Sequence, residues 1–140
     1  MNFTKQHAAA AFGLAGAYHF WYHAKHERIV KRLPAFFYEL PSGHLPVRDW
    51  IRSLDAADRK IIGEDIKVVE FSWPIGMPRV RALGAGLWEV RCSLTQGRIA
   101  RVLFCINGAR MVLLHGFIKK TQKTSQFDLD LALKRKKEIA

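Results

Sequence analysis

Acidic side chains, cysteines and long apolar runs are all scarce in this sequence of 140 residues. Only 12 Asp and Glu accompany 23 Lys and Arg, so the formal net charge is +11 at pH 7. That excess predicts a polyanionic partner, most often a nucleic acid, although an anionic membrane surface or an acidic protein would suit the same composition. No apolar run reaches the length of a membrane span, so we expect no membrane partner. A hydrophobic content of 49% argues against general disorder and predicts one domain with a packed core.

The cysteines, Cys92 and Cys105, both fall in apolar runs that are typical of strands. A cysteine without a partner usually behaves as a small buried apolar residue, and nothing else marks the chain as secreted. We therefore expect two reduced thiols in the core rather than a disulfide. This expectation predicts a cytoplasmic location.

Residues 1–29 differ in composition from the remainder of the chain. We expect them to be an N-terminal extension, either disordered or produced by a misassigned start, in front of a domain that spans residues 30–140. The short apolar run at 8–17 resembles a signal-peptide core, but only Lys5 precedes it, so we favour a poorly packed segment. We also hypothesise that translation starts at Val30.

Three histidines in this extension, His19, His23 and His26, have a spacing that would place them on one side of a helix. Three imidazoles could in principle hold one metal ion. Because no cysteine or well-placed carboxylate completes a zinc site there, we predict neither a metal nor another cofactor.

The region from Arg79 to Thr121 carries the clearest pattern in the chain. Three runs rich in β-branched and aromatic residues, Leu87–Leu94, Ile99–Ile106 and Met111–Ile118, are separated by Gln96-Gly97 and Asn107-Gly108. Such dipeptides favour two-residue hairpin turns, so the region predicts an antiparallel meander. With these turns Ile106 pairs with Ala109, Val102 with Leu113, Ala100 with His115, Cys92 with Arg101, and Arg91 with Val102.

Alternation of side chains along each strand divides this meander into two faces. The face expected to lie under helices carries Trp88, Val90, Cys92, Leu94, Ile99, Leu103, Cys105, Val112 and Leu114, with Arg101 as its odd member. The face expected to be open carries Glu89, Arg91, Arg98, Val102, Phe104, Met111, Leu113, His115, Phe117 and Lys119. Because the open face mixes apolar and basic groups with an imidazole, we predict that it binds a polyanion.

Helices and one further strand flank the meander. Lys31–Leu40 predicts a first strand, placed at a sheet edge by Pro34. Pro46 predicts the start of a short amphipathic helix, and Asp55 the N-cap of a second helix that ends before Pro74. Ser125, with Asp128 three residues later, resembles a capping box and predicts a final helix to about residue 139. The predicted fold class is α+β, with the first strand and two helices packed on a three- to four-stranded meander.

Three motifs occur within this order of elements: L-G-A-G-L-W-E-V-R at Leu83–Arg91, R-V-L-F at Arg101–Phe104, and L-L-H-G-F-I-K-K-T-Q-K-T at Leu113–Thr124. In them the chain resembles the RelE/ParE toxin superfamily, and within it the HigB-like, phage-derived toxins of type II toxin–antitoxin systems. The resemblance covers roughly residues 31–140 and implies a RelE-like fold. It also implies a ribosome-dependent, metal-independent mRNA endoribonuclease that inhibits translation. The implied partners are mRNA, the ribosome and a helix-turn-helix antitoxin encoded in the same operon.

Two alternatives stay open, because fold analogy alone does not settle an activity. One is a ParE-like toxin that binds DNA gyrase without cutting RNA. The other is an inactive, phage-derived RNA-binding domain.

The same resemblance implies roles for individual residues. Arg91 matches the position of a catalytic arginine, His115 would transfer a proton because imidazole titrates near neutrality, and Lys119 would join them. The residues expected to contact RNA are Arg79, Arg81, Arg98, Arg101, Lys120 and Lys123. Some RelE-like enzymes use a tyrosine near the C-terminus, but this chain has none after Tyr38, so His115 or a lysine would take that role. The structural alternatives are an ion pair between Arg91 and Glu89, and a purely structural His115.

Overall fold

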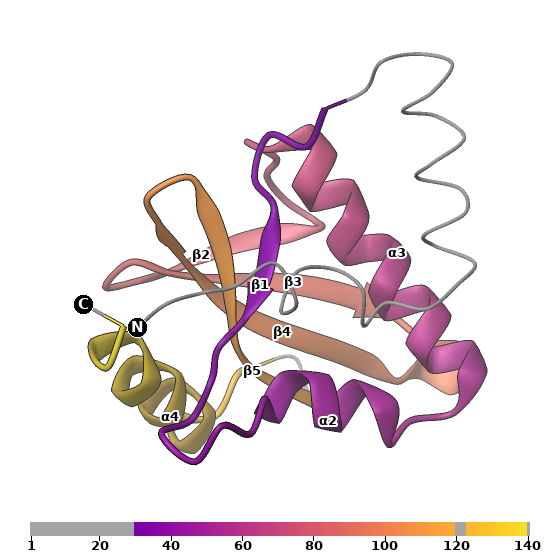
Figure 1. Ribbon diagram of the computed structural model, residues 1–140. Helices are drawn as coiled ribbons and strands as arrows, with labels where there is room; N and C mark the ends of the chain where they lie inside the picture. Colours follow the sequence, from indigo (N-terminus) through magenta and orange to yellow (C-terminus); the bar gives the residue numbers. More distant parts are fainter. Residues whose placement is uncertain (1–29, 120–122, 140) are drawn as a thin grey trace.

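The computed structural model describes residues 30–119 and 123–139 (Figure 1). The elements are β1 (Ala35–Phe37), α2 (Pro46–Arg52), α3 (Ala56–Ser72), β2 (Val80–Gly84), β3 (Leu87–Ser93), the short 3₁₀ helix η3 (Thr95–Gly97), β4 (Ile99–Asn107), β5 (Arg110–Lys119) and α4 (Gln126–Lys137). The fold is α+β, as predicted. Expectations about the extension and its three histidines lie outside the described residues. Within those residues, no helix has the length and apolarity needed to cross a bilayer.

The sheet has five strands in the order β1-β5-β4-β3-β2. Strands β2 to β5 form the predicted antiparallel meander, whereas β1 pairs with β5 in parallel. β1 is an edge strand, as Pro34 predicts, because proline cannot donate a ladder hydrogen bond. The carbonyl of Pro34 instead accepts a hydrogen bond from the backbone N–H of Met111 at 2.9 Å.

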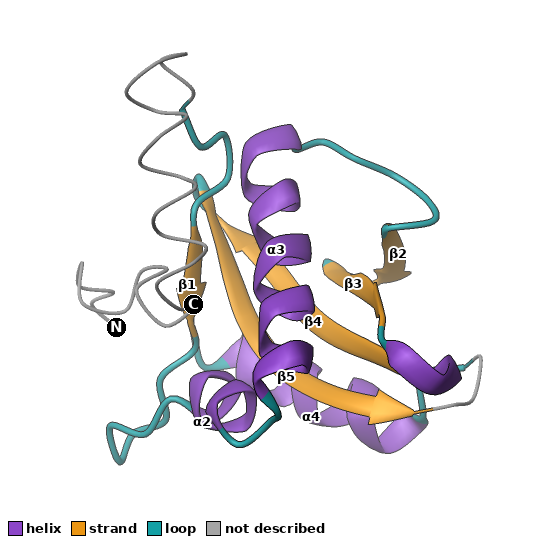
Figure 2. Ribbon diagram, turned by 90° about the vertical axis from the view of Figure 1, so that its right-hand side faces the viewer, coloured by secondary structure: helices purple, strands orange, loops and turns teal. Residues whose placement is uncertain are grey.

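Helices cover both faces of this sheet. α2 and α3 pack on one face through Val47, Ile51, Ile62, Ile66 and Val69, and α4 packs on the other through Ala132 (Figures 1 and 2). The sheet therefore separates two apolar clusters. The prediction that one face would be open is wrong, because α4 lies across part of it.

The predicted register of β3 and β4 is wrong by one residue. Arg91 pairs with Arg101, and Cys92 with Ala100. Gln96 and Gly97 do have positive φ values of 61° and 70°, but they lie in the three-residue turn η3. An odd loop length moves β4 by one position, so that every β4 side chain changes face relative to β3.

This shift decides which β4 residues each helix covers. Val102 and Phe104 belong to the cluster under α2 and α3, whereas Leu103 and Cys105 belong to the cluster with α4. Both cysteines are buried and free, as predicted, but Cys92 and Cys105 lie on opposite faces of the sheet. Burial raises the pKa of both thiols, which keeps them protonated.

The predicted register of β4 and β5 is also wrong. Asn107 pairs with Arg110, so the turn is Gly108-Ala109, and only Gly108 has a positive φ, 62°. This is the pattern of a type II′ turn rather than type I′. Further along, Phe104 pairs with Leu113 but Leu103 pairs with His115, which makes Leu114 the extra residue of a β-bulge. The bulge turns His115 towards the face of Leu103, which is the face covered by α4.

Gly116 lies directly beneath the indole of Trp50 on α2. A Cβ atom at this position would come 2.3 Å from Cζ3 of Trp50. We expect Gly116→Ala to lower the free energy of unfolding by about 1–3 kcal/mol, because an overpacked core must shift its side chains or backbone. Urea unfolding measures the effect.

The matched control is Gly76→Ala, since an added Cβ at Gly76 meets no atom within 4 Å and the backbone there does not have a positive φ. A Gly116→Ala protein as stable as Gly76→Ala would show that the contact with Trp50 does not constrain this position.

Candidate active site

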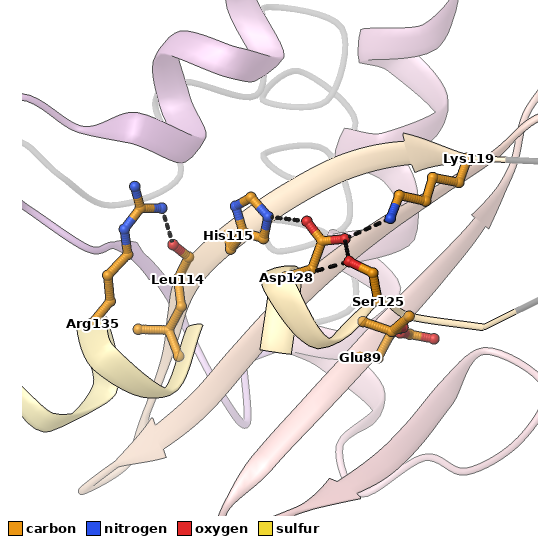
Figure 3. Close-up of polar contacts among 8 residues, drawn as sticks. Glu89, Leu114, His115, Lys119, Ser125, Asp128 and Arg135 are labelled. Atoms are coloured by element: carbon orange, nitrogen blue, oxygen red, sulfur yellow. Dashed lines mark hydrogen bonds and ion pairs between the residues drawn. The ribbon is translucent and has the colours of Figure 1, made fainter. Parts of the chain in front are cut away.

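Side chains from β5 and from the first turn of α4 meet on the α4 face of the sheet. The Nε2 atom of His115 lies 2.7 Å from Oδ1 of Asp128, and Nζ of Lys119 lies 2.8 Å from Oδ2 (Figure 3). The His115 side chain is 15% exposed and that of Asp128 only 6%. Phe117 lies between His115 and Lys119 in the sequence. The centroid of its ring is 5.4 Å from that of the His115 ring and 5.2 Å from Nζ of Lys119.

Asp128 is held as a charged acceptor. Although burial alone would raise its pKa, hydrogen bonds from Lys119, Ser125 and His115 lower the pKa of this carboxyl below its usual value. The Ser125 hydroxyl donates to Oδ2 at 2.5 Å and in turn accepts the backbone N–H of Asp128 at 3.2 Å. Ser125 therefore caps α4 as predicted, but only this half of the capping box forms, because the Asp128 carboxylate is turned to the sheet rather than to the Ser125 backbone.

A buried ion-pair network lies beside this cluster. Nη1 of Arg101 donates to Oε1 of Glu89 at 3.1 Å, and both side chains are almost fully buried, at 0% and 2% exposed. The Thr124 hydroxyl also donates to Glu89, so the segment before α4 is fastened to the middle of the sheet. Arg81, on β2, reaches the same carboxylate at 3.7 Å.

These contacts assign Arg101 and Glu89 to the framework of the site. A guanidinium with no exposed surface cannot contact RNA, so we leave Arg101 out of the interface expected from the sequence. The alternative pairing of Arg91 with Glu89 does not occur, because Arg101 and Arg81 occupy that carboxylate.

Arg91 projects from β3 onto the same face as His115. In the part of the chain that the structure describes, its guanidinium has no hydrogen-bond or ion-pair partner, and its side chain is half-buried. Arg91 pairs with Arg101 on β4, which pairs with Phe117 on β5. Arg91 and the His115 strand are thus two strand spacings apart, about 10 Å, and a long side chain can bridge much of that gap.

The other residues predicted to contact RNA do not gather at this cluster. Arg79 contacts Asp65 of α3 at 3.6 Å, and Arg98 makes a two-point ion pair with Asp58 of α3 at 2.9 and 3.0 Å. Hydrogen bonds from Arg98 lower the pKa of Asp58. Lys123 is exposed just before α4, and Lys120 lies outside the described residues.

Sequence reasoning missed the part that Asp128 has in this site. The capping-box spacing identified Asp128 only as a helix-start residue, and no local pattern indicated that its carboxylate would meet His115 and Lys119. Among residues 30–119 and 123–139, no group of three or more His, Cys, Asp or Glu side chains is arranged to hold a metal ion.

Comparison with known families adds the decisive observation. The family model described as phage derived protein Gp49-like (DUF891) matches residues 49–137, which is more than half of the chain. The chain belongs to the phage-derived Gp49-like family. This is a family of RelE/ParE-type toxins, so the Gp49-like chain is toxin-like and its family implies an antitoxin partner in general.

The matched region runs from α2 to the end of α4 and includes every residue of the cluster formed by His115, Lys119 and Asp128. It leaves out β1. No curated protein matches the Gp49-like chain.

Proposed function

We propose that this Gp49-like protein is a HigB-like toxin that cleaves mRNA on translating ribosomes without a metal ion. In such a reaction the 2′-hydroxyl of the RNA gives its proton to water as its oxygen attacks the adjacent phosphate, and the bond to the 5′-oxygen breaks as that oxygen accepts a proton. The protein must bind the strand, offset charge on the phosphorane and supply that proton.

The observation that supports this proposal is the presence of Arg91 and His115 on one face of the sheet, with the Arg91 guanidinium not neutralised by any described side chain. A guanidinium can contact two phosphate oxygens at once, so Arg91 would offset the negative charge of the phosphorane. His115 would deliver the proton to the 5′-oxygen. Lys119 and Lys123 would add positive charge along the path of the strand.

The proposed partners follow from the charge of this surface. An antitoxin of the helix-turn-helix type, encoded in the same operon, would neutralise the basic side chains around Arg91 and keep RNA out. The toxin gene must therefore be expressed without its neighbour when its activity is measured.

Induced expression of the full chain in bacteria, followed by primer extension on a translated transcript and on the same transcript without its start codon, tests the proposal. We expect cuts only in the translated transcript. Arg91→Ala should reduce cleavage about 10²–10³-fold, the usual cost of removing one group that stabilises transition-state charge. Arg52→Ala, which removes an exposed arginine at the end of α2, is the matched control and should cleave normally.

Growth arrest with intact mRNA and inhibited supercoiling would favour the alternative, a ParE-like toxin that binds DNA gyrase. If expression causes neither growth arrest nor RNA cleavage, both proposed activities are contradicted. The inactive RNA-binding domain would then be the remaining alternative.

A further inference from the structure

Asp128 makes more contacts to the proposed catalytic groups than helix capping requires. Its two carboxylate oxygens together accept hydrogen bonds from His115, Lys119 and Ser125, at 2.7, 2.8 and 2.5 Å (Figure 3). Capping alone would need only the Ser125 hydroxyl and the backbone N–H of Asp128. The bulge at Leu114 and the docking of α4 are both needed to bring the His115 ring to this carboxylate.

The chemistry of this contact fixes the position of one proton. An ionised carboxylate can only accept hydrogen bonds, so a nitrogen that contacts it must carry the hydrogen. Since Asp128 contacts Nε2 of His115, the neutral imidazole is held with its hydrogen on Nε2. The lone pair, or the second hydrogen once the ring is protonated, is then on Nδ1.

We propose that Asp128 is a positioning residue that holds His115 in the Nε2–H tautomer, so that Nδ1 is the atom that exchanges a proton with RNA. This inference rests on the proposed nuclease function. It assigns to α4 a task beyond covering the sheet, because the first turn of the helix carries the group that orients the imidazole. The bonds from Thr124 to Glu89 on β3 and from Lys119 on β5 to Asp128 hold that turn against the sheet.

The test uses the full chain labelled with ¹⁵N in its histidine rings. The ring nitrogen shifts of His115 in the wild-type protein should have the values of the Nε2–H tautomer. In Asp128→Asn the amide group can donate to the ring, so this preference should be lost. The kcat for RNA cleavage should fall at least tenfold and up to about 10⁴-fold, as when the carboxylate of a Ser-His-Asp triad becomes an amide, while KM stays nearly constant.

Two variants separate positioning from other effects. Asp130→Asn makes the same change of charge on an exposed residue of α4, whose carboxylate binds Gln126, and should change neither the tautomer nor kcat. Ser125→Ala removes the helix cap but keeps the Asp128 carboxylate, so it should lower thermal stability and leave the tautomer in place.

The proposal is overturned if wild-type His115 carries its hydrogen on Nδ1, a result that does not depend on how any variant folds. It is also overturned if the tautomer of His115 is unchanged in Asp128→Asn, or if the tautomer changes and kcat does not. If the wild-type protein leaves RNA intact, the nuclease function itself fails, whereas the NMR spectra still report separately whether Asp128 fixes the tautomer.

Discussion

Replacing His115 with alanine is expected to slow RNA cleavage by about 10²–10⁴-fold, the range for loss of a general acid or base. The 5′-oxygen would then have to leave as an alkoxide or take its proton from water. Single-turnover cleavage of ribosome-bound mRNA measures the rate of this step directly. His44→Ala is the matched control, because His44 is exposed in the loop before α2, where its Nδ1 atom lies 3.1 Å from the Ser42 hydroxyl and far along the chain from the cluster on β5 and α4.

A modified substrate distinguishes proton donation from other roles of His115. If sulfur replaces the bridging 5′-oxygen, the leaving group departs as a thiolate and needs no proton. His115→Ala should cleave this RNA nearly as fast as the wild-type protein does. An equally large loss on both substrates would show that His115 does not protonate the leaving group.

Arg101→Ala is expected to have the largest effect on stability, lowering the free energy of unfolding by about 3–5 kcal/mol. The substitution leaves Glu89 buried without its main cation, and it removes a large side chain with no exposed surface. The loss is large compared with the roughly 5–15 kcal/mol that holds a typical domain folded. Urea unfolding followed by circular dichroism measures it.

A double substitution identifies the cause of this loss. Arg101→Met combined with Glu89→Gln removes both charges, keeps similar volumes and retains an acceptor for Thr124. Because replacing both members of a buried ion pair is often close to neutral, the double variant should be clearly more stable than Arg101→Ala. Equal losses in the two variants would mean that packing, rather than the uncompensated charge of Glu89, causes the effect.

Most elements were predictable because their signals are local. Pro46 begins α2, Asp55 stands at the N-cap of α3, and Ser125 caps α4 through its side chain. Pro34 places β1 at the edge of the sheet. Each of these positions depends on a few residues that are neighbours in the sequence, so it can be predicted from a short sequence pattern.

The strand registers were not predictable in the same way, because they depend on how many residues each turn uses. The turn that contains Gln96 has three residues, one more than the two-residue turn that was predicted. β5 also contains a bulge at Leu114, which the sequence analysis did not predict. Each difference moves side chains to the opposite face. The two errors cancel between β3 and β5, so Arg91 and His115 share a face as predicted although neither hairpin was paired correctly.

Contacts across the domain were the least predictable part. Arg101 stood out as the odd member of an apolar face, but its burial against Glu89 depends on the true register of β4. The position of α4 over the sheet, and therefore the meeting of Asp128 with His115, requires the whole domain. Such contacts join residues that are neighbours only after folding.

The parallel pairing of β1 with β5 also constrains the order in which a newly made chain can fold. β1 is synthesised long before β5, which is its neighbour in the sheet. This edge of the sheet therefore cannot form until α2, α3 and the meander have been synthesised. Pairing between segments so distant in sequence is slow to form. His115 and Lys119 belong to β5, and Asp128 to α4, so their cluster is among the last parts to assemble. A nascent chain therefore carries no assembled site while most of its domain is still being translated.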